Sequence, residues 1–150
     1  MNPMTRTQFK VKTAVRIALG AIFTVFGLNG FLHFLPMPAP SGLAAVFMGG
    51  LGATGYFFPL LKGTEVIAGL LLLSNRFVPL ALTVLAPIVV NIVAFHAFLA
   101  PSGIALPLLI VGLGVYLAYT ERAVFAPVLR ARSSEPVPQS ARRGHASAAV

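Results

Sequence analysis

The chain contains no cysteine and no tryptophan, and only 3 of its 150 residues are acidic. The absence of cysteine excludes disulfides, thiol redox chemistry, iron–sulfur clusters, cysteine-ligated zinc and covalently attached haem. Charged residues of either sign make up 9% of the chain, whereas a soluble domain carries about 25%. This scarcity of charge excludes an ordinary soluble globule and a disordered chain.

Hydrophobic residues are abundant instead. They make up 57% of the sequence, and the mean hydropathy is +0.90. The net charge is +8, but most of the basic residues lie at the two ends of the chain: Arg6, Lys10, Lys12, Arg16, Arg122, Arg130, Arg132, Arg142 and Arg143. Basic residues at both ends of an apolar chain indicate an integral membrane protein rather than a protein that binds nucleic acid.

Four membrane spans are predicted from the apolar runs, because a hydrocarbon core of about 30 Å needs about 20 apolar residues per helix. They cover residues 14–35, 56–73, 77–99 and 104–119. The first ends at a run of three prolines, Pro36, Pro38 and Pro40, through which no helix continues. The polar triplet at 74–76 predicts a tight interfacial turn before the third span.

The second span can be cut in two ways. A helix at 43–61 would leave the apolar run 66–73 in a loop, whereas a helix at 56–73 buries that run but brings Lys62 and Glu65 into the membrane. We favour the second cut. Residues 41–54 then form a Gly-rich outer half-helix or re-entrant segment, whose glycines predict close backbone packing: Gly49, Gly50, Gly52 and Gly55.

The predicted fold class is therefore all-α, an integral membrane four-helix bundle with both termini in the cytoplasm and a Gly-rich half-helix between spans 1 and 2. Arg76 lies in an inner turn, and the outer loops at 36–42 and 100–103 contain no Lys or Arg. The location is the inner or plasma membrane. The chain divides into a basic N-terminus, a membrane domain and a basic, largely disordered tail: residues 1–13, 14–120 and 121–150.

Polar side chains at membrane depth need a reason, because a charge at a helix centre costs about 2.5–3.5 kcal/mol on the insertion scale. Asn29 and His33 share one face of the first span at a spacing of four residues. All the strongest polar groups lie in the outer halves of three spans. We therefore predict a pocket with proton-handling capacity from this set: Asn29, His33, Lys62, Glu65, Asn91 and His96.

A structural interpretation stays open beside the pocket. Lys62 and Glu65 can neutralise each other, the two asparagines can hydrogen-bond across helices, and the two histidines lie within about a turn of the membrane boundary. The glycines inside the spans are predicted to be helix-packing positions: Gly20, Gly27, Gly112 and Gly114.

Several of these segments resemble the DoxX family of small four-helix membrane proteins. The run Arg16-Ile17-Ala18-Leu19-Gly20, with Phe23 and Phe26-Gly27-Leu28-Asn29-Gly30 after it, resembles the opening R-x-x-L-G…F…G helix of that family. Residues 65–72 resemble its E-x-x-x-G-x-L-L segment, and residues 79–82 with Asn91 and His96 resemble its third helix. The likeness covers about residues 14–120. His33 stands near the position where many members carry a lysine.

The resemblance implies an accessory or quinone-interacting subunit of a membrane redox complex, with no intrinsic cofactor, a quinone as the bound molecule, and a protein partner or a second copy. One alternative is a non-catalytic membrane scaffold or partner-binding subunit. A less favoured alternative is a small proton or cation transporter built around Glu65. A divalent metal or a haem held by His33 and His96 is the least favoured, and no metal site is assigned.

Overall fold

The computed structural model describes residues 5–126 and contains helices and turns but no strand in that part of the chain. The tail predicted to be disordered at 133–150 lies outside the described residues. The helices are α1 Arg6–Leu32, α2 Gly42–Ala53, α3 Phe57–Leu73, α4 Val78–Phe98, the short 3-10 turn η1 Pro101–Gly103, α5 Ala105–Thr120 and α6 Arg122–Phe125. The all-α prediction is confirmed for the described residues.

Helix α1 begins eight residues before the predicted start of the first span. Thr5 and Gln8 form a reciprocal capping box, in which each side chain accepts a hydrogen bond from the other residue's backbone N–H. This cap satisfies two amide groups that a helix start leaves free. Residues 6–13 are therefore part of the first helix, which extends into the segment predicted as the basic N-terminus.

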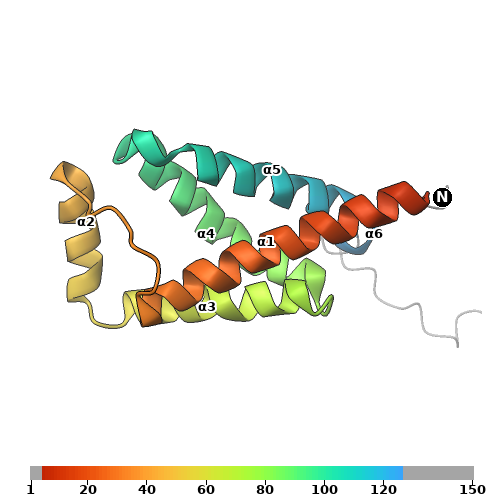
Figure 1. Cartoon of the computed structure of the whole chain (residues 1–150), viewed down its shortest axis with the longest axis horizontal. Coiled ribbons are helices and arrows are strands. Elements are labelled where there is room, and N and C mark those ends of the chain that lie inside the picture. The colour runs from red at the N-terminus through yellow and green to blue at the C-terminus, as the bar shows by residue number, and fades with distance from the viewer. Residues whose placement is uncertain (1–4, 127–150) are drawn as a thin grey trace, which may run out of the picture.

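A sharp bend separates α2 from α3. The two helices meet at 91° across residues 54–56, and Gly55 adopts a positive φ of 73° at the break. Helix α2 stands across the end of the other helices in Figure 1, while α3 runs alongside α1. The helix predicted at 56–73 is thus present with nearly the same bounds, and the glycine at the bend supplies a conformation that other residues rarely adopt.

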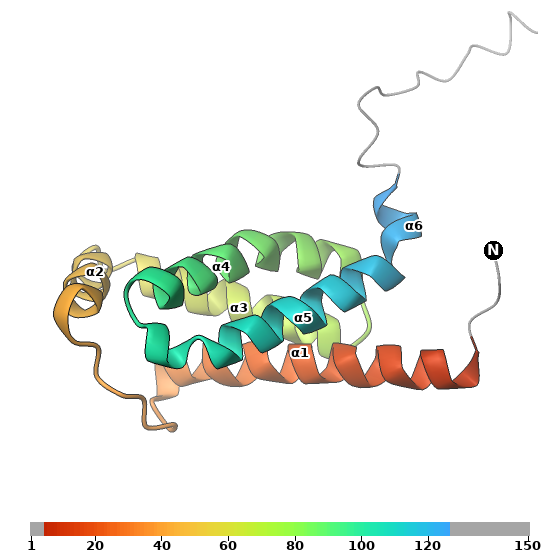
Figure 2. The ribbon, with the colours of Figure 1, turned by 90° about the horizontal axis from the view of Figure 1, so that it is seen from above.

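The glycines of α2 do not pack as predicted. A Cβ atom at Gly49, Gly50 or Gly55 would meet nothing within 4 Å, and one at Gly52 would only touch the Phe58 ring at 3.5 Å. Helix α2 lies at the end of the molecule instead of between other helices (Figure 2), so its glycines meet no closely packed neighbouring helix.

The closest helix pair is α1 with α3. A Cβ atom at Gly20 would lie 3.0 Å from the Gly69 carbonyl oxygen, and one at Gly69 would lie 2.9 Å from the Gly20 carbonyl oxygen. Gly27 similarly makes room for Val66. Small residues let two backbones approach in this way. The prediction is confirmed at Gly20 and Gly27.

The same prediction fails on α5. A Cβ atom at Gly112 or Gly114 would meet nothing within 4 Å. Helix α5 contacts α4 and α1 through larger side chains instead. Gly20, Gly27 and Gly69 therefore mark the close packing of α1 with α3, whereas the two glycines of α5 mark no such contact.

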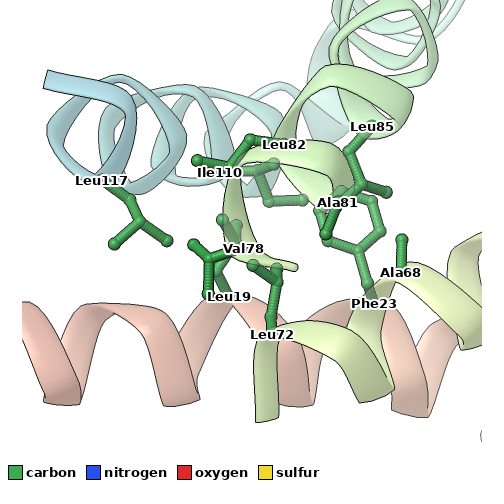
Figure 3. Close-up of a cluster of buried hydrophobic side chains, with 10 residues drawn as sticks. All are labelled: Leu19, Phe23, Ala68, Leu72, Val78, Ala81, Leu82, Leu85, Ile110 and Leu117. Atoms are coloured by element: carbon green, nitrogen blue, oxygen red, sulfur yellow. The ribbon is translucent and has the colours of Figure 1, made fainter. Parts of the chain in front are cut away.

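The hydrophobic core lies in the half of the molecule nearest the α3–α4 turn. Its buried side chains come from four helices and converge in Figure 3: Leu19, Phe23, Ala68, Leu72, Val78, Ala81, Leu82, Leu85, Ile110 and Leu117. Helix α1 contacts α3 and α5, and α4 contacts α3 and α5. The outer half, which carries the predicted polar residues, contributes none of these core side chains.

Arg16 lies in the packed interior, unlike the exposed basic residues near the ends of the chain. Its guanidinium is buried and donates hydrogen bonds to the carbonyl oxygens of Leu72 and of Leu73, the latter at 3.0 Å. These carbonyls end α3 and have no partner within the helix. A cation there also complements the negative end of the helix dipole. The sequence prediction that Arg16 merely flanks the apolar body is wrong.

An ion pair joins the start of α1 to the end of α5. Lys12 Nζ lies 2.7 Å from Glu121 Oε1, and both side chains are partly buried. Arg122 follows at once, with its guanidinium 4.3 Å from the centre of the Tyr119 ring. Helix α6 continues to Phe125, so the first residues of the segment predicted as tail are helical.

Two helices, α1 and α4, are long and apolar enough to cross a membrane. The bent pair of α2 and α3 qualifies as a third if it is taken as one broken span, and α5 is a shorter apolar helix. These apolar helices indicate a membrane environment for the protein.

Candidate functional site

The pair Lys62–Glu65 is the most unusual polar feature of the described residues. Both side chains lie on α3, with Lys62 Nζ 2.8 Å from Glu65 Oε2. The Glu65 side chain is 3% exposed and the Lys62 side chain is 25% exposed. A buried carboxylate is therefore paired with a cation that retains access to the surface, an arrangement that lowers the cost of placing both in an apolar interior.

A glycine on α1 makes the room for this pair. A Cβ atom at Gly30 would lie 2.7 Å from Lys62 Cδ, so the aliphatic stem of Lys62 crosses α1 at that point. The pair is built into the same α1–α3 contact that Gly20, Gly27 and Gly69 form further along. Its geometry depends on the two helix backbones being close.

Asn29 is buried, and both ends of its amide group bind one residue. Its Oδ1 accepts a hydrogen bond of 2.6 Å from the Leu35 N–H, and its Nδ2 donates one of 3.3 Å to the Leu35 carbonyl oxygen. The side chain therefore fastens the segment after α1 back onto the helix.

His33 ends α1. It adopts a left-handed conformation with φ of 51°, and its N–H donates to the Asn29 carbonyl oxygen at 3.0 Å. His33 is exposed at the surface of the protein. This is the αL termination of a helix, which glycine or asparagine usually provides. His33 thus lies near Asn29 by backbone contact but does not face it as a co-ligand.

The two asparagines differ in a way that yields a prediction. We expect Asn29→Ala to lower the free energy of unfolding by about 1–2 kcal/mol, because two buried hydrogen bonds are lost. Asn91→Ala removes an exposed hydrogen bond within one helix and is expected to stay within about 0.5 kcal/mol of wild type. Thermal unfolding of both variants in the same detergent measures this difference, and equal losses would contradict the capping role of Asn29.

Asn91 and His96 bind the backbone of their own helix. Asn91 is exposed, and its Nδ2 donates to the Pro87 carbonyl oxygen at 3.1 Å. His96 Nδ1 lies 2.8 Å from the Ile92 carbonyl oxygen. Since a carbonyl only accepts, Nδ1 carries the hydrogen there and Nε2 is the acceptor of the neutral ring.

The surroundings of His96 are apolar. Its ring meets the Phe95 ring edge to face at a centroid distance of 5.2 Å, and a Cβ atom at Gly103 would lie 2.7 Å from His96 Cδ2. The ring therefore fills the space between α4 and η1. Phe95 also contacts Phe47 of α2, with ring centroids 5.8 Å apart.

Of the six predicted site residues, the structure joins Lys62 to Glu65 by a side-chain contact. The side chains of Asn29, Asn91 and His96 bind backbone groups of their own segments, and His33 contributes only its backbone N–H, to the end of α1. Within residues 5–126, no three His, Asp or Glu side chains gather closely enough to hold a metal ion. The six residues were predicted to lie at a similar depth in the membrane, but their side chains do not meet at one site.

Two adjoining apolar grooves run between α3 and α4, and we call them together the α3–α4 groove. Their volumes are about 260 and 190 Å³, and they share Thr64 and Val84. The rest of the lining is apolar: Phe57, Leu60, Leu61, Ile67, Ala68, Leu71, Leu80, Ala81 and Ile88. The hydroxyl of Thr64 donates to the Leu60 carbonyl oxygen. None of the six predicted residues lines this groove.

The α3–α4 groove fits a hydrocarbon chain better than a quinone headgroup. A quinone needs hydrogen-bond donors at its carbonyl oxygens, and the hydroxyl of Thr64 is already committed. The sequence analysis did not find this groove, because no pattern in the two helices distinguishes its lining from other lipid-facing residues.

Comparisons of the chain with protein-family models, with curated proteins and with solved structures found no match.

Proposed function

We propose that α1, α3, α4 and α5 each cross the bilayer, with both termini in the cytoplasm and α2 at the outer surface. The Lys12–Glu121 pair supports this layout, because it joins the start of α1 to the end of α5 at one end of the molecule. Helices α3 and α5 contain 17 and 16 residues. At 1.5 Å per residue they span about 25 Å, slightly less than a hydrocarbon core of about 30 Å.

Reporter fusions test this layout. A reporter after Arg76 is expected to score as cytoplasmic, and one after Ser41 as extracytoplasmic, because the basic residues favour the inner side. A fusion after Ala126 should agree with the one after Arg76. An extracytoplasmic signal from the Arg76 fusion would overturn the proposal.

For the activity, we propose a DoxX-like accessory subunit of a membrane redox complex that is itself non-catalytic and binds a protein partner. The observation that carries this proposal is that five of the six predicted site residues, all but His33, have a side-chain partner within the chain. Asn29, Asn91 and His96 bind backbone carbonyls or amides, and Lys62 binds Glu65. The resemblance to the DoxX family supports the association with redox partners.

A second candidate is proton handling by Glu65 for a quinone-linked partner. It is favoured by the contrast between a 3% exposed carboxylate and a 25% exposed lysine beside it, because such a pair connects a buried proton site to the surface. Electrons would come from the partner protein, which must carry the redox centre.

The double variant Lys62→Leu/Glu65→Gln separates these two candidates. Removing both members of a buried pair is often neutral for stability. We expect the double variant to keep its melting temperature, to copurify with its partner, and to support wild-type quinone reduction in isolated membranes. The matched control is Lys12→Gln/Glu121→Gln, which removes the other ion pair.

Loss of quinone reduction in a double variant that stays folded and keeps its partner would overturn the non-catalytic proposal and establish Glu65 as a proton-handling group. Loss of the partner, with the Lys12/Glu121 control unaffected, would instead assign partner binding to the Lys62–Glu65 region.

A further inference from the structure

The α3–α4 groove extends along α3. Along α3 its lining extends from Phe57 to Leu71. At 1.5 Å per residue this is about 21 Å, longer than one half of a hydrocarbon core, which is about 15 Å. An extended hydrocarbon chain matches this shape.

The groove offers polar groups at one end and not along its walls. Its inner part is lined by Leu71 and Leu80, which flank the turn between α3 and α4. In that turn the Arg76 N–H donates to the Leu71 carbonyl oxygen at 3.0 Å. The backbone of Arg76 is therefore joined directly to a residue of the groove lining.

Arg76 is the cation at this end of the groove, and it is exposed. The two acidic side chains in the described residues are occupied elsewhere, Glu65 by Lys62 and Glu121 by Lys12. The N-terminal end of α4 at Val78 is positive, but the C-terminal end of α3 on the same side is negative and binds the buried Arg16, so Arg76 supplies the exposed positive charge. The end of the groove is thus positively charged while its walls are apolar.

We propose that the α3–α4 groove binds an anionic phospholipid of the leaflet on the Arg76 side, with one acyl chain between α3 and α4 and the phosphate at Arg76. The apolar walls select a hydrocarbon chain, and the charge at the end selects a net negative headgroup. This proposal does not depend on the function proposed above.

Native mass spectrometry of the full-length protein in detergent tests it. Phosphatidylglycerol and phosphatidylcholine with the same acyl chains are added in equal amounts. We expect phosphatidylglycerol to be retained about fivefold more than phosphatidylcholine, the factor given by one cation near an anionic lipid. Arg76→Gln should abolish the preference, whereas Lys10→Gln, at an exposed basic position on α1, should keep it.

A second pair of variants tests the groove itself. Val84 lines both parts of the groove, and Val84→Phe should fill it and reduce the retained phosphatidylglycerol at least several-fold. Val90 is an exposed position of the same helix outside the lining, and Val90→Phe should leave retention unchanged. Wild-type melting temperatures would show that the variants are folded.

Three results would overturn the proposal. They are a preference that survives Arg76→Gln, retention that survives Val84→Phe, and displacement of phosphatidylglycerol by an equal amount of an isoprenoid quinone. The last result would assign the groove to a quinone tail.

Discussion

Replacing Gly69 by alanine is expected to destabilise the protein by about 1–3 kcal/mol, the usual cost of overpacking. A methyl group there would lie 2.7 Å from the Thr24 backbone nitrogen and 2.9 Å from the Gly20 carbonyl oxygen. Both are backbone atoms, so the clash cannot be relieved by a side-chain rotation. Helices α1 and α3 would have to separate, which would also disturb the contact between Gly30 and Lys62.

Gly63 on the same helix provides the control, because its replacement by alanine should change the stability in the opposite direction. A Cβ atom at Gly63 would meet nothing within 4 Å. Gly63→Ala should therefore stabilise the helix by about 0.5–1 kcal/mol, because alanine loses less backbone freedom on folding. Melting temperatures of the two variants in one detergent measure the contrast. Stabilisation by both substitutions would show that α1 and α3 are not in close backbone contact.

The second large effect is expected at the Lys62–Glu65 pair, and it should be asymmetric. Lys62→Met keeps the aliphatic stem against Gly30 but leaves Glu65, at 3% exposure, without its cation. Breaking a buried pair in this way costs about 3–5 kcal/mol. Glu65→Gln leaves Lys62, whose side chain is 25% exposed and whose ammonium group can turn to the surface. Its cost should be on the order of 1 kcal/mol.

The free energies of unfolding of these two single variants test the asymmetry. The double variant Lys62→Leu/Glu65→Gln provides the reference. It lacks both members of the pair and should be more stable than Lys62→Met. An equal loss in both single variants would mean that Lys62 is as confined as Glu65, which contradicts its position at the edge of the α1–α3 contact.

The helix bounds were largely predictable from the sequence. Helices end at three features that are visible in the sequence: prolines 36, 38 and 40, the polar triplet at 74–76, and the Pro101–Gly103 turn. The cut at 56–73 was correct because the apolar run 66–73 has to be buried. The early start of α1 was also readable, since Thr5 and Gln8 have the spacing of a capping box.

The role of Arg16 had a signal that the sequence analysis did not use. Positions 16, 20, 23, 27 and 30 recur every three or four residues and so share one helix face. Four of these positions contact α3 or the core, at Gly20, Phe23, Gly27 and Gly30. Arg16 continues the same face, which distinguishes it from Lys10.

The hydrogen-bond partners of the polar residues could not be predicted from their expected depth in the membrane alone. Asn29, Asn91 and His96 each find a backbone partner within six residues. Such local bonds depend on where a helix ends or where a proline interrupts it, and not on what the neighbouring helices carry. The contact between Lys62 and Glu65 was predictable, because a spacing of three residues places both on one face.

The contact of Arg16 with the end of α3 also bears on how the protein is made. Its acceptors on Leu72 and Leu73 lie 56 and 57 residues further along the chain. Synthesis proceeds from the N-terminus, so α1 leaves the ribosome and meets the insertion machinery before these carbonyl groups exist. During that interval the guanidinium has no partner within the chain and is best held at the lipid headgroups. We therefore expect α1 to reach its final depth only after α3 is complete.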